Sequence, residues 1–224
     1  MEIKKRDMLI GILLLGSIWG FFEVVLGGGM KAASIPYKGD LMTGLGIGTM
    51  AVAYAVYRKA LPLIAIALVA VAVRQLAVPI LQVPFMCKAN SCLAMTLGGG
   101  ALAGSVAVAG RHLKRGVAPR AAAGFSAGLL AATSFYFIGM HAAPCRYLMS
   151  FNRPGGLAAF TLAEGLIWAA MGAFFFPVGY SVGERLESRL LALKLHRPMA
   201  YYLGSVGLVA CCWVASAVAI ARGL

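Results

Sequence analysis

The sequence predicts an all-α membrane protein, a polytopic bundle of transmembrane helices with a six-span core and a seventh span at the C-terminus. Of its 224 residues, 61% are hydrophobic and only 12% are charged, and its mean hydropathy is +0.86. Soluble domains are typically near half apolar and a quarter charged. The chain also contains 28 glycines, and small residues let helices approach one another closely in a membrane.

Seven apolar segments come close to the roughly 20 residues that a helix needs to cross the bilayer core. Pro62 costs little at the start of the third segment, whereas Pro79 and Pro84 should bend or end that segment. The predicted spans are 8–27, 41–57, 61–83, 92–110, 119–140, 157–181 and 200–221. These spans and their short connections account for nearly all of the sequence. We therefore expect one integral membrane domain over residues 1–224, with the six-span core at 8–181.

The basic residues predict the orientation in the membrane. The net charge of +13 is spread over short clusters between apolar segments, which indicates the positive-inside rule and not nucleic-acid binding. We expect the inner (plasma) membrane, a cytoplasmic N-terminus and an external C-terminus. Segment 184–197 alternates charge and leucine at helical spacing, so it is either an amphipathic connector on the membrane surface or a solvated helix. The predicted cytoplasmic residues are Lys4, Lys5, Arg6, Arg58, Lys59, Arg111, Lys114, Arg115, Arg120, Arg185, Arg189, Lys194 and Arg197.

Three ionisable residues fall inside predicted spans, where they are costly and therefore candidates for function. Glu23, Arg74 and Glu164 lie in the first, third and sixth spans, all in the predicted outer half of the membrane. They form either a structural ion pair or a polar pocket open to the outside. Trp19 and Trp168 each lie one helical turn deeper than a glutamate, on the same helix face, and an aromatic floor beneath polar groups suits a small organic ligand.

Three cysteines, Cys87, Cys92 and Cys145, lie at the predicted external side. A disulfide is favoured in an oxidising compartment, but three cysteines leave the pairing open. An alternative is a soft-metal site in which these thiols act with His141 and nearby methionines. The glycine-rich LGGGALAG stretch lacks the lysine of a phosphate-binding loop, and no nucleophile–base pattern is visible. We therefore expect no enzyme activity and no cofactor.

The size, the six-span core with both ends inside and the outward-facing pocket resemble the substrate-binding (S) components of energy-coupling factor transporters. The Gly16–Ser17–Ile18–Trp19–Gly20 step is similar to the first-span motif with which S components dock on a coupling subunit. The resemblance implies that loop 28–40 covers the ligand, with Tyr37, Lys38 and Asp40 as lid residues. The seventh span and the external cysteines depart from the family.

The sequence thus predicts a membrane-embedded solute-binding subunit for uptake of a small vitamin-like or cofactor-related solute. It would work with partner subunits that dock on the Gly16/Gly20 face. The ligand-binding candidates are Glu23, Arg74, Glu164, Trp19, Trp168 and Tyr37. Two alternatives use the external cysteines: a membrane anchor or redox subunit that handles quinone or thiol electrons, and a soft-metal transporter.

Overall fold

The computed structural model describes residues 5–224, except for the side chain of Cys87. Across that range the chain is helical and has no strand, and seven helices are long and apolar enough to cross a membrane. The predicted fold class is therefore confirmed. Lys4, which counts toward the predicted orientation, lies outside the described residues.

The first three spans position most of the charged candidates. They are α1 (Lys5–Phe21) continued by the π-helical turn η1 (Phe22–Leu26) and by α2 (Gly27–Ala32), then α3 (Lys38–Tyr57), then α4 (Leu61–Arg74) followed by the short α5 (Ala77–Leu81). The third span breaks between α4 and α5 because Pro79 has no N–H to donate to the carbonyl of Gln75. This break leaves Arg74 at the end of a helix.

The remaining spans are longer than the sequence predicts. The fourth span is α6 (Ala89–Ala109), preceded by the 3-10 turn η2 (Phe85–Lys88) and followed by η3 (Gly110–Arg115), and the fifth is α7 (Val117–Ala142). The sixth span consists of α9 (Gly156–Phe160), the π-helical turn η4 (Thr161–Gly165) and α10 (Leu166–His196). The seventh is α11 (Pro198–Ala221). A short helix, α8 (Arg146–Met149), lies in the connection after α7. The predicted connector 184–197 is not a separate element, because α10 continues through it to His196.

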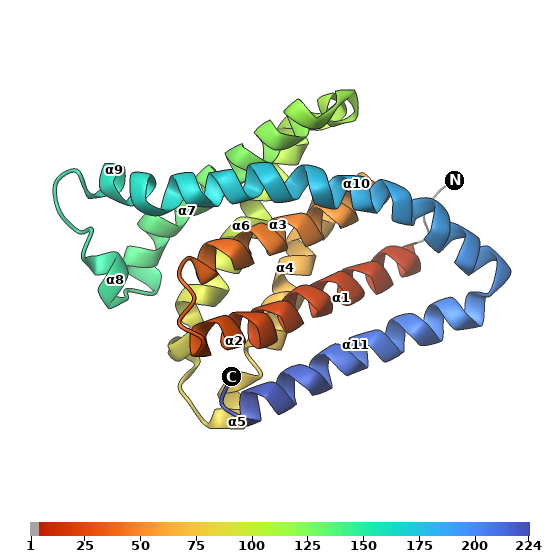
Figure 1. Cartoon of the computed structure of the whole chain (residues 1–224), viewed down its shortest axis with the longest axis horizontal. Coiled ribbons are helices and arrows are strands. Elements are labelled where there is room, and N and C mark those ends of the chain that lie inside the picture. Colours follow the sequence, from red (N-terminus) through yellow and green to blue (C-terminus); the bar gives the residue numbers. More distant parts are fainter. Residues whose placement is uncertain (1–4) are drawn as a thin grey trace.

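Figure 1 shows α10 crossing the bundle above α3, with α1 below and α11 at the edge. Helix α10 packs mainly against α3 and α7, α6 against α7 and α4, and α1 against α4 and α11. The start of α1 and the C-terminus lie at opposite ends of the bundle (Figure 1). The seventh span therefore joins the bundle chiefly through the first.

Glycines set the closest helix contacts. A Cβ atom added at Gly124 would lie 2.1 Å from the carbonyl oxygen of Gly172, so α7 and α10 meet backbone to backbone. The Gly16/Gly20 face, to which the resemblance assigns a partner subunit, packs against α4 instead. Added Cβ atoms there would each lie 2.5 Å from Val69 or Val73. This corrects the prediction, because α4 of the same chain already occupies that face.

Polar contacts join α1 to the end of α10 and to α11. At the N-terminal end of the bundle, Asp7 accepts hydrogen bonds from Lys194 (2.5 Å) and from the Tyr202 hydroxyl (3.0 Å). Deeper in the bundle, the indole N–H of Trp213 donates to the Ser17 hydroxyl at 2.9 Å. These bonds hold the seventh span in a fixed register.

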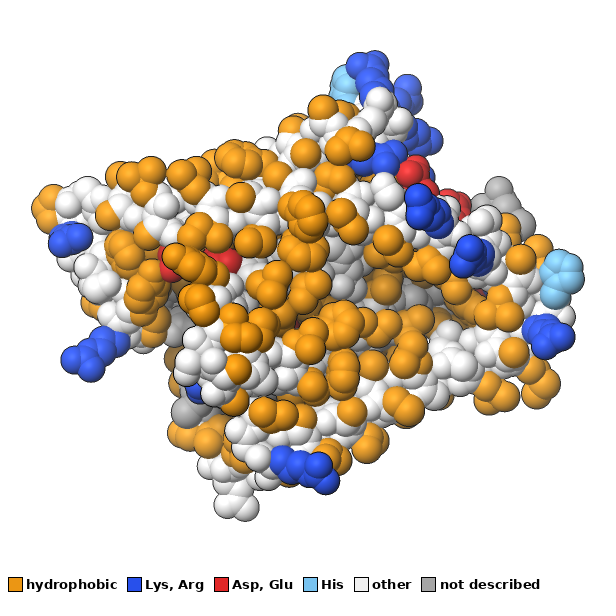
Figure 2. Space-filling view, in the orientation of Figure 1, with side chains coloured by type: hydrophobic (Ala, Val, Ile, Leu, Met, Phe, Trp, Pro, Cys, Tyr) orange, Lys and Arg blue, Asp and Glu red, His pale blue; other side chains and the backbone are white. Residues whose placement is uncertain are grey.

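The outer surface of the bundle is apolar, as contact with lipid requires. Large hydrophobic side chains such as Leu61, Val108 and Phe174 are exposed on different helices, and Figure 2 shows hydrophobic atoms spread over the middle of the visible face. Most Lys and Arg side chains in this view lie toward the end that holds the N-terminus and the turn between α10 and α11. Such a surface is stable only in a hydrocarbon environment.

Candidate functional site

A partly enclosed cavity of about 280 Å³ lies at the end of the bundle away from the N-terminus. This volume is near the lower end of the roughly 300–1,000 Å³ that is typical of small-molecule sites. The first six spans contribute side chains to its lining and α11 contributes none. Four of the six predicted ligand-binding residues line the cavity: Trp19, Glu23, Arg74 and Trp168.

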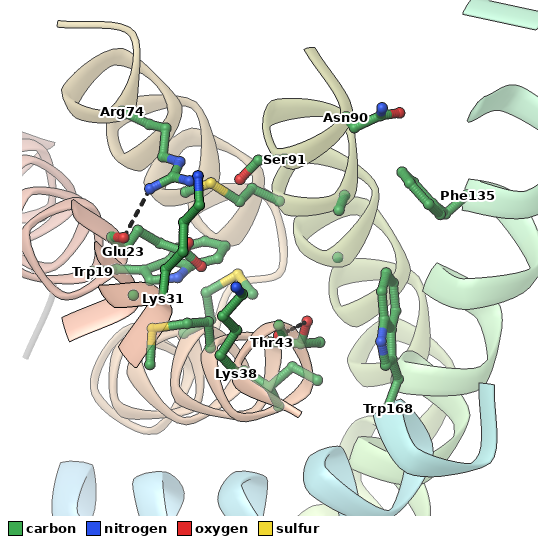
Figure 3. A pocket seen from close by; sticks show the side chains of 18 residues that line it. Trp19, Glu23, Lys31, Lys38, Thr43, Arg74, Asn90, Ser91, Phe135 and Trp168 are labelled. Carbon is green, nitrogen blue, oxygen red and sulfur yellow. Dashed lines mark hydrogen bonds between the residues drawn. The ribbon is translucent and has the colours of Figure 1, made fainter. Parts of the chain in front are cut away.

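Arg74 and Glu23 meet, but through the backbone of Glu23. The guanidinium Nη1 of Arg74 donates to the main-chain carbonyl oxygen of Glu23 at 2.8 Å (Figure 3). Glu23 lies in η1, where π-helical pairing shifts the carbonyls from their usual partners, and such turns are common at functional sites. The bond therefore stabilises an irregular turn and leaves the Glu23 side chain to face the cavity.

Several buried polar atoms around the cavity have no partner in the protein. Among the described residues, six buried side-chain nitrogen or oxygen atoms lack a hydrogen bond, and three of these belong to cavity residues. They are Nε1 of Trp19, Nε of Arg74 and Oδ1 of Asn90. Buried polar groups are nearly always satisfied, since an unmade hydrogen bond costs about 1–3 kcal/mol. A polar ligand or ordered water would remove this cost.

Aromatic rings form opposite walls of the cavity. In Figure 3, Trp168 and Phe135 lie on one side and Trp19 on the other. The rings of Phe135 and Trp168 have centroids 5.8 Å apart at an interplanar angle of 40°. Gly46 makes room for Trp19, because a Cβ atom there would lie 2.4 Å from the indole ring. Aromatic side chains on two sides of a cavity offer surfaces on which a ring of the ligand can stack.

Two lysines that flank the turn between α2 and α3 complete the lining. Lys31 and Lys38 extend toward the middle of the cavity in Figure 3. The resemblance singles out Lys38 as a lid residue, whereas nothing in the sequence singles out Lys31. Asn90, Ser91, Thr43 and Phe135 were also missed. A polar Asn–Ser pair at the start of an apolar span is the signal that could have found two of them.

Glu164 is not part of the cavity lining. It lies in the second π-helical turn, η4, and accepts a hydrogen bond from the Tyr147 hydroxyl at 2.5 Å. Its other electrostatic neighbour is Asp40, whose side chain is buried. Burial and the hydrogen bond to Glu164 raise the pKa of the Tyr147 hydroxyl, so this hydroxyl stays a donor at neutral pH. The three predicted charges therefore separate into two groups, one around Glu23 and one around Glu164.

Tyr37 also lies outside the cavity. It precedes α3 with a left-handed backbone (φ 55°), and its side chain is 66% exposed. The predicted loop 28–40 is largely helical, because α2 extends to Ala32 and α3 begins at Lys38. Of the three lid candidates, Lys38 reaches the cavity, Asp40 reaches Glu164 and Tyr37 reaches neither.

The described cysteines are free thiols: Cys92, Cys145, Cys211 and Cys212. Cys92 accepts a hydrogen bond from Gln75, and Cys145 caps α8 by accepting from the backbone N–H of Leu148. Cys92 and Cys145 are therefore not joined in a disulfide, and the Cys87 side chain lies outside the described part. Within that part, no group of three or more His, Cys, Asp or Glu side chains is placed to hold a metal ion. His141 instead contacts the backbone carbonyl of Phe137.

A scan against known protein families, a search of curated proteins and a search of solved structures found no match to this chain. The chemical groups of the cavity are therefore what indicates a function. It offers cationic groups, one buried carboxylate, unpartnered N–H donors and aromatic walls within a membrane bundle. That set is suited to binding a small polar organic molecule.

Proposed function

We propose that this protein is a membrane-embedded solute-binding subunit that takes up a small vitamin-like or cofactor-related solute together with partner subunits. The observation that carries the proposal is the cavity, in which Arg74 presents an N–H group and Asn90 a side-chain oxygen that the protein leaves unpartnered.

The orientation of the cavity supports capture from outside. The positive-inside rule assigns the basic N-terminal end of the bundle to the cytoplasm, and the cavity lies at the other end. The third, fourth and sixth spans contribute residues that are far apart in sequence, so the cavity exists only in the folded bundle.

Mass spectrometry of small molecules that co-purify with the protein in mild detergent tests this proposal. We expect one organic solute in near-stoichiometric amount, and we expect Glu23→Gln to release it. Glu164→Gln is the matched control, because Glu164 also lies in a π-helical turn one turn above a tryptophan but does not line the cavity.

Retention of the solute by Glu23→Gln, or its loss from both variants alike, would place the solute elsewhere. The absence of any bound solute, together with no binding of added solutes, would overturn the proposal. Both variants should elute as folded monodisperse protein in size-exclusion chromatography, so that a change in solute content reports on the cavity.

A further inference from the structure

The charges that line the cavity are unequal. Lys31, Lys38 and Arg74 are cationic, and Glu23 is the one acidic residue of the lining. Among the described side chains, the ion pairs involve other residues, so neither lysine is neutralised by an acidic partner. Arg74 offsets Glu23, with which it is in contact. The two lysines therefore leave the cavity with excess positive charge, which favours an anionic group on the ligand.

The deep side of the cavity carries a donor next to an acceptor. The carboxyl of Glu23 lies beside the Arg74 cation and the indole N–H of Trp19. Arg74 also presents a buried N–H without a partner, at Nε. An acceptor flanked by donors is complementary to a ligand edge on which an N–H and a C=O lie side by side. Cyclic amides and ureides present such an edge.

The aromatic lining favours a ring-shaped ligand. Trp19 lies on one side of the cavity and Phe135 with Trp168 on the other (Figure 3). A flat ring can stack there, whereas a bulky aliphatic molecule would leave the rings poorly packed. The cavity volume of about 280 Å³ restricts the ligand to a small ring system with few substituents.

We infer that the solute is a small planar cyclic amide or ureide that carries one anionic substituent. Its amide edge pairs with Glu23 and with the Nε–H group of Arg74, and its anionic group faces Lys31 and Lys38. This inference rests on the proposed function, because it names the chemical class of the solute for the same cavity.

Three commercially available probes separate the two recognition elements. Orotate carries a ureide edge and a carboxylate, uracil carries the edge alone, and benzoate is a planar carboxylate without the edge. Quenching of tryptophan fluorescence in detergent, calibrated by isothermal titration calorimetry, measures their affinities. We expect orotate to bind at least roughly tenfold more tightly than either uracil or benzoate, since each missing charged contact is worth about 1.4 kcal/mol or more.

Substitutions test which residues recognise the amide edge of the ligand and which recognise its anionic group. The double variant Lys31→Ala/Lys38→Ala should weaken orotate and benzoate by roughly tenfold and leave uracil unchanged. Glu23→Gln should weaken orotate and uracil and leave benzoate unchanged. Lys59→Ala is the control for charge alone, because Lys59 lies in the turn at the opposite end of α3 and does not line the cavity.

Equal binding of uracil and orotate would overturn the anionic requirement, and equal binding of benzoate and orotate would overturn the amide edge. If none of the probes binds while a different solute co-purifies, the chemical class is wrong and the proposed function stands. If neither a probe nor a co-purifying solute binds, the proposed function itself fails. A bound cationic solute would also overturn the class.

Discussion

The two glutamates within the spans lie in the same local sequence pattern but have different neighbours in the structure. Glu23 and Glu164 each lie in a five-residue π-helical turn, and each has a tryptophan four residues away on the cytoplasmic side of the predicted orientation. Glu23 faces a cavity beside Arg74. Glu164 instead accepts a hydrogen bond from Tyr147, which lies in the connection after α7. One pattern therefore supports a candidate binding site in one half of the bundle and a loop anchor in the other.

The difference arises from the neighbouring helix and not from the glutamate itself. Arg74 stands at the end of α4 because Pro79 interrupts the third span, and so it can reach the turn that holds Glu23. Glu164 instead has the carboxyl of Asp40 and the hydroxyl of Tyr147 as its neighbours. A charged group inside a membrane protein takes its role from the group that compensates it.

The largest expected effect comes from removing the compensating charge. Arg74→Gln should destabilise the protein by about 1–3 kcal/mol, because it removes the charged hydrogen bond to the backbone carbonyl of Glu23 and the cation beside the Glu23 carboxyl. The double variant Arg74→Gln/Glu23→Gln should recover the part of that loss that comes from the uncompensated carboxyl. Unfolding in detergent, followed by circular dichroism, measures both.

The Glu164 region supplies the comparison for this experiment. Glu164→Gln should change the unfolding free energy by less than about 1 kcal/mol, because an amide oxygen can still accept from Tyr147. If Arg74→Gln were as stable as the unmodified protein, Arg74 would not compensate Glu23. If the double variant were no more stable than Arg74→Gln, the loss would come from the lost bond to the backbone of Glu23.

The second prediction concerns the two tryptophans. Trp19→Phe should weaken solute binding by roughly tenfold, because it removes the indole N–H beside Glu23 as well as part of a wall. Trp168→Phe should weaken binding by only about threefold, since the indole of Trp168 contributes mainly ring surface. Titration calorimetry with the co-purified solute gives both values. Equal effects would mean that the N–H of Trp19 does not contact the solute.

Much of the bundle was predictable from the sequence. The seven apolar segments gave seven spans, and their observed bounds differ mainly by extension into polar flanks, as in α10, which runs to His196. Hydrophobicity fixes where a helix must be buried in lipid, but it says little about where the helix ends, because polar residues such as those of 184–197 can continue a helix into water.

The candidate site was predictable only in part. Depth along the helix placed Glu23 and Arg74 at a similar level, and the structure brings them together. The same reasoning included Glu164, which lies apart, because depth does not fix the direction in which a side chain faces. Gly16 and Gly20 likewise indicate a close helix contact, but the sequence cannot tell a helix of the same chain from one of a partner.

The third prediction tests the role of Tyr147 as an anchor. Tyr147→Phe should lower the protection of amide hydrogens in residues 143–155 by about 1 kcal/mol, measured by hydrogen exchange, because it removes the bond to Glu164. Solute binding should not change. Loss of solute binding in this variant would mean that Glu164 and Tyr147 belong to the solute site.

The pH dependence of the same bond follows from the raised pKa of Tyr147. A pKa above the value of about 10 for an unfolded tyrosine means that the folded state holds this proton more tightly. The contribution of Tyr147 to stability is therefore fully present below pH of about 10 and declines above it. The difference in stability between the unmodified protein and Tyr147→Phe should be constant from neutral to mildly alkaline pH.

The smallest expected effect is that of Cys145→Ser, and it bears on the cysteine hypotheses. A serine hydroxyl can cap α8 by accepting from the backbone N–H of Leu148 as the thiol does. We therefore expect a change in unfolding free energy below about 0.5 kcal/mol and unchanged solute binding. A thiol whose loss abolished function would carry redox or metal chemistry, so a marked loss of function in Cys145→Ser would favour those hypotheses over the cavity.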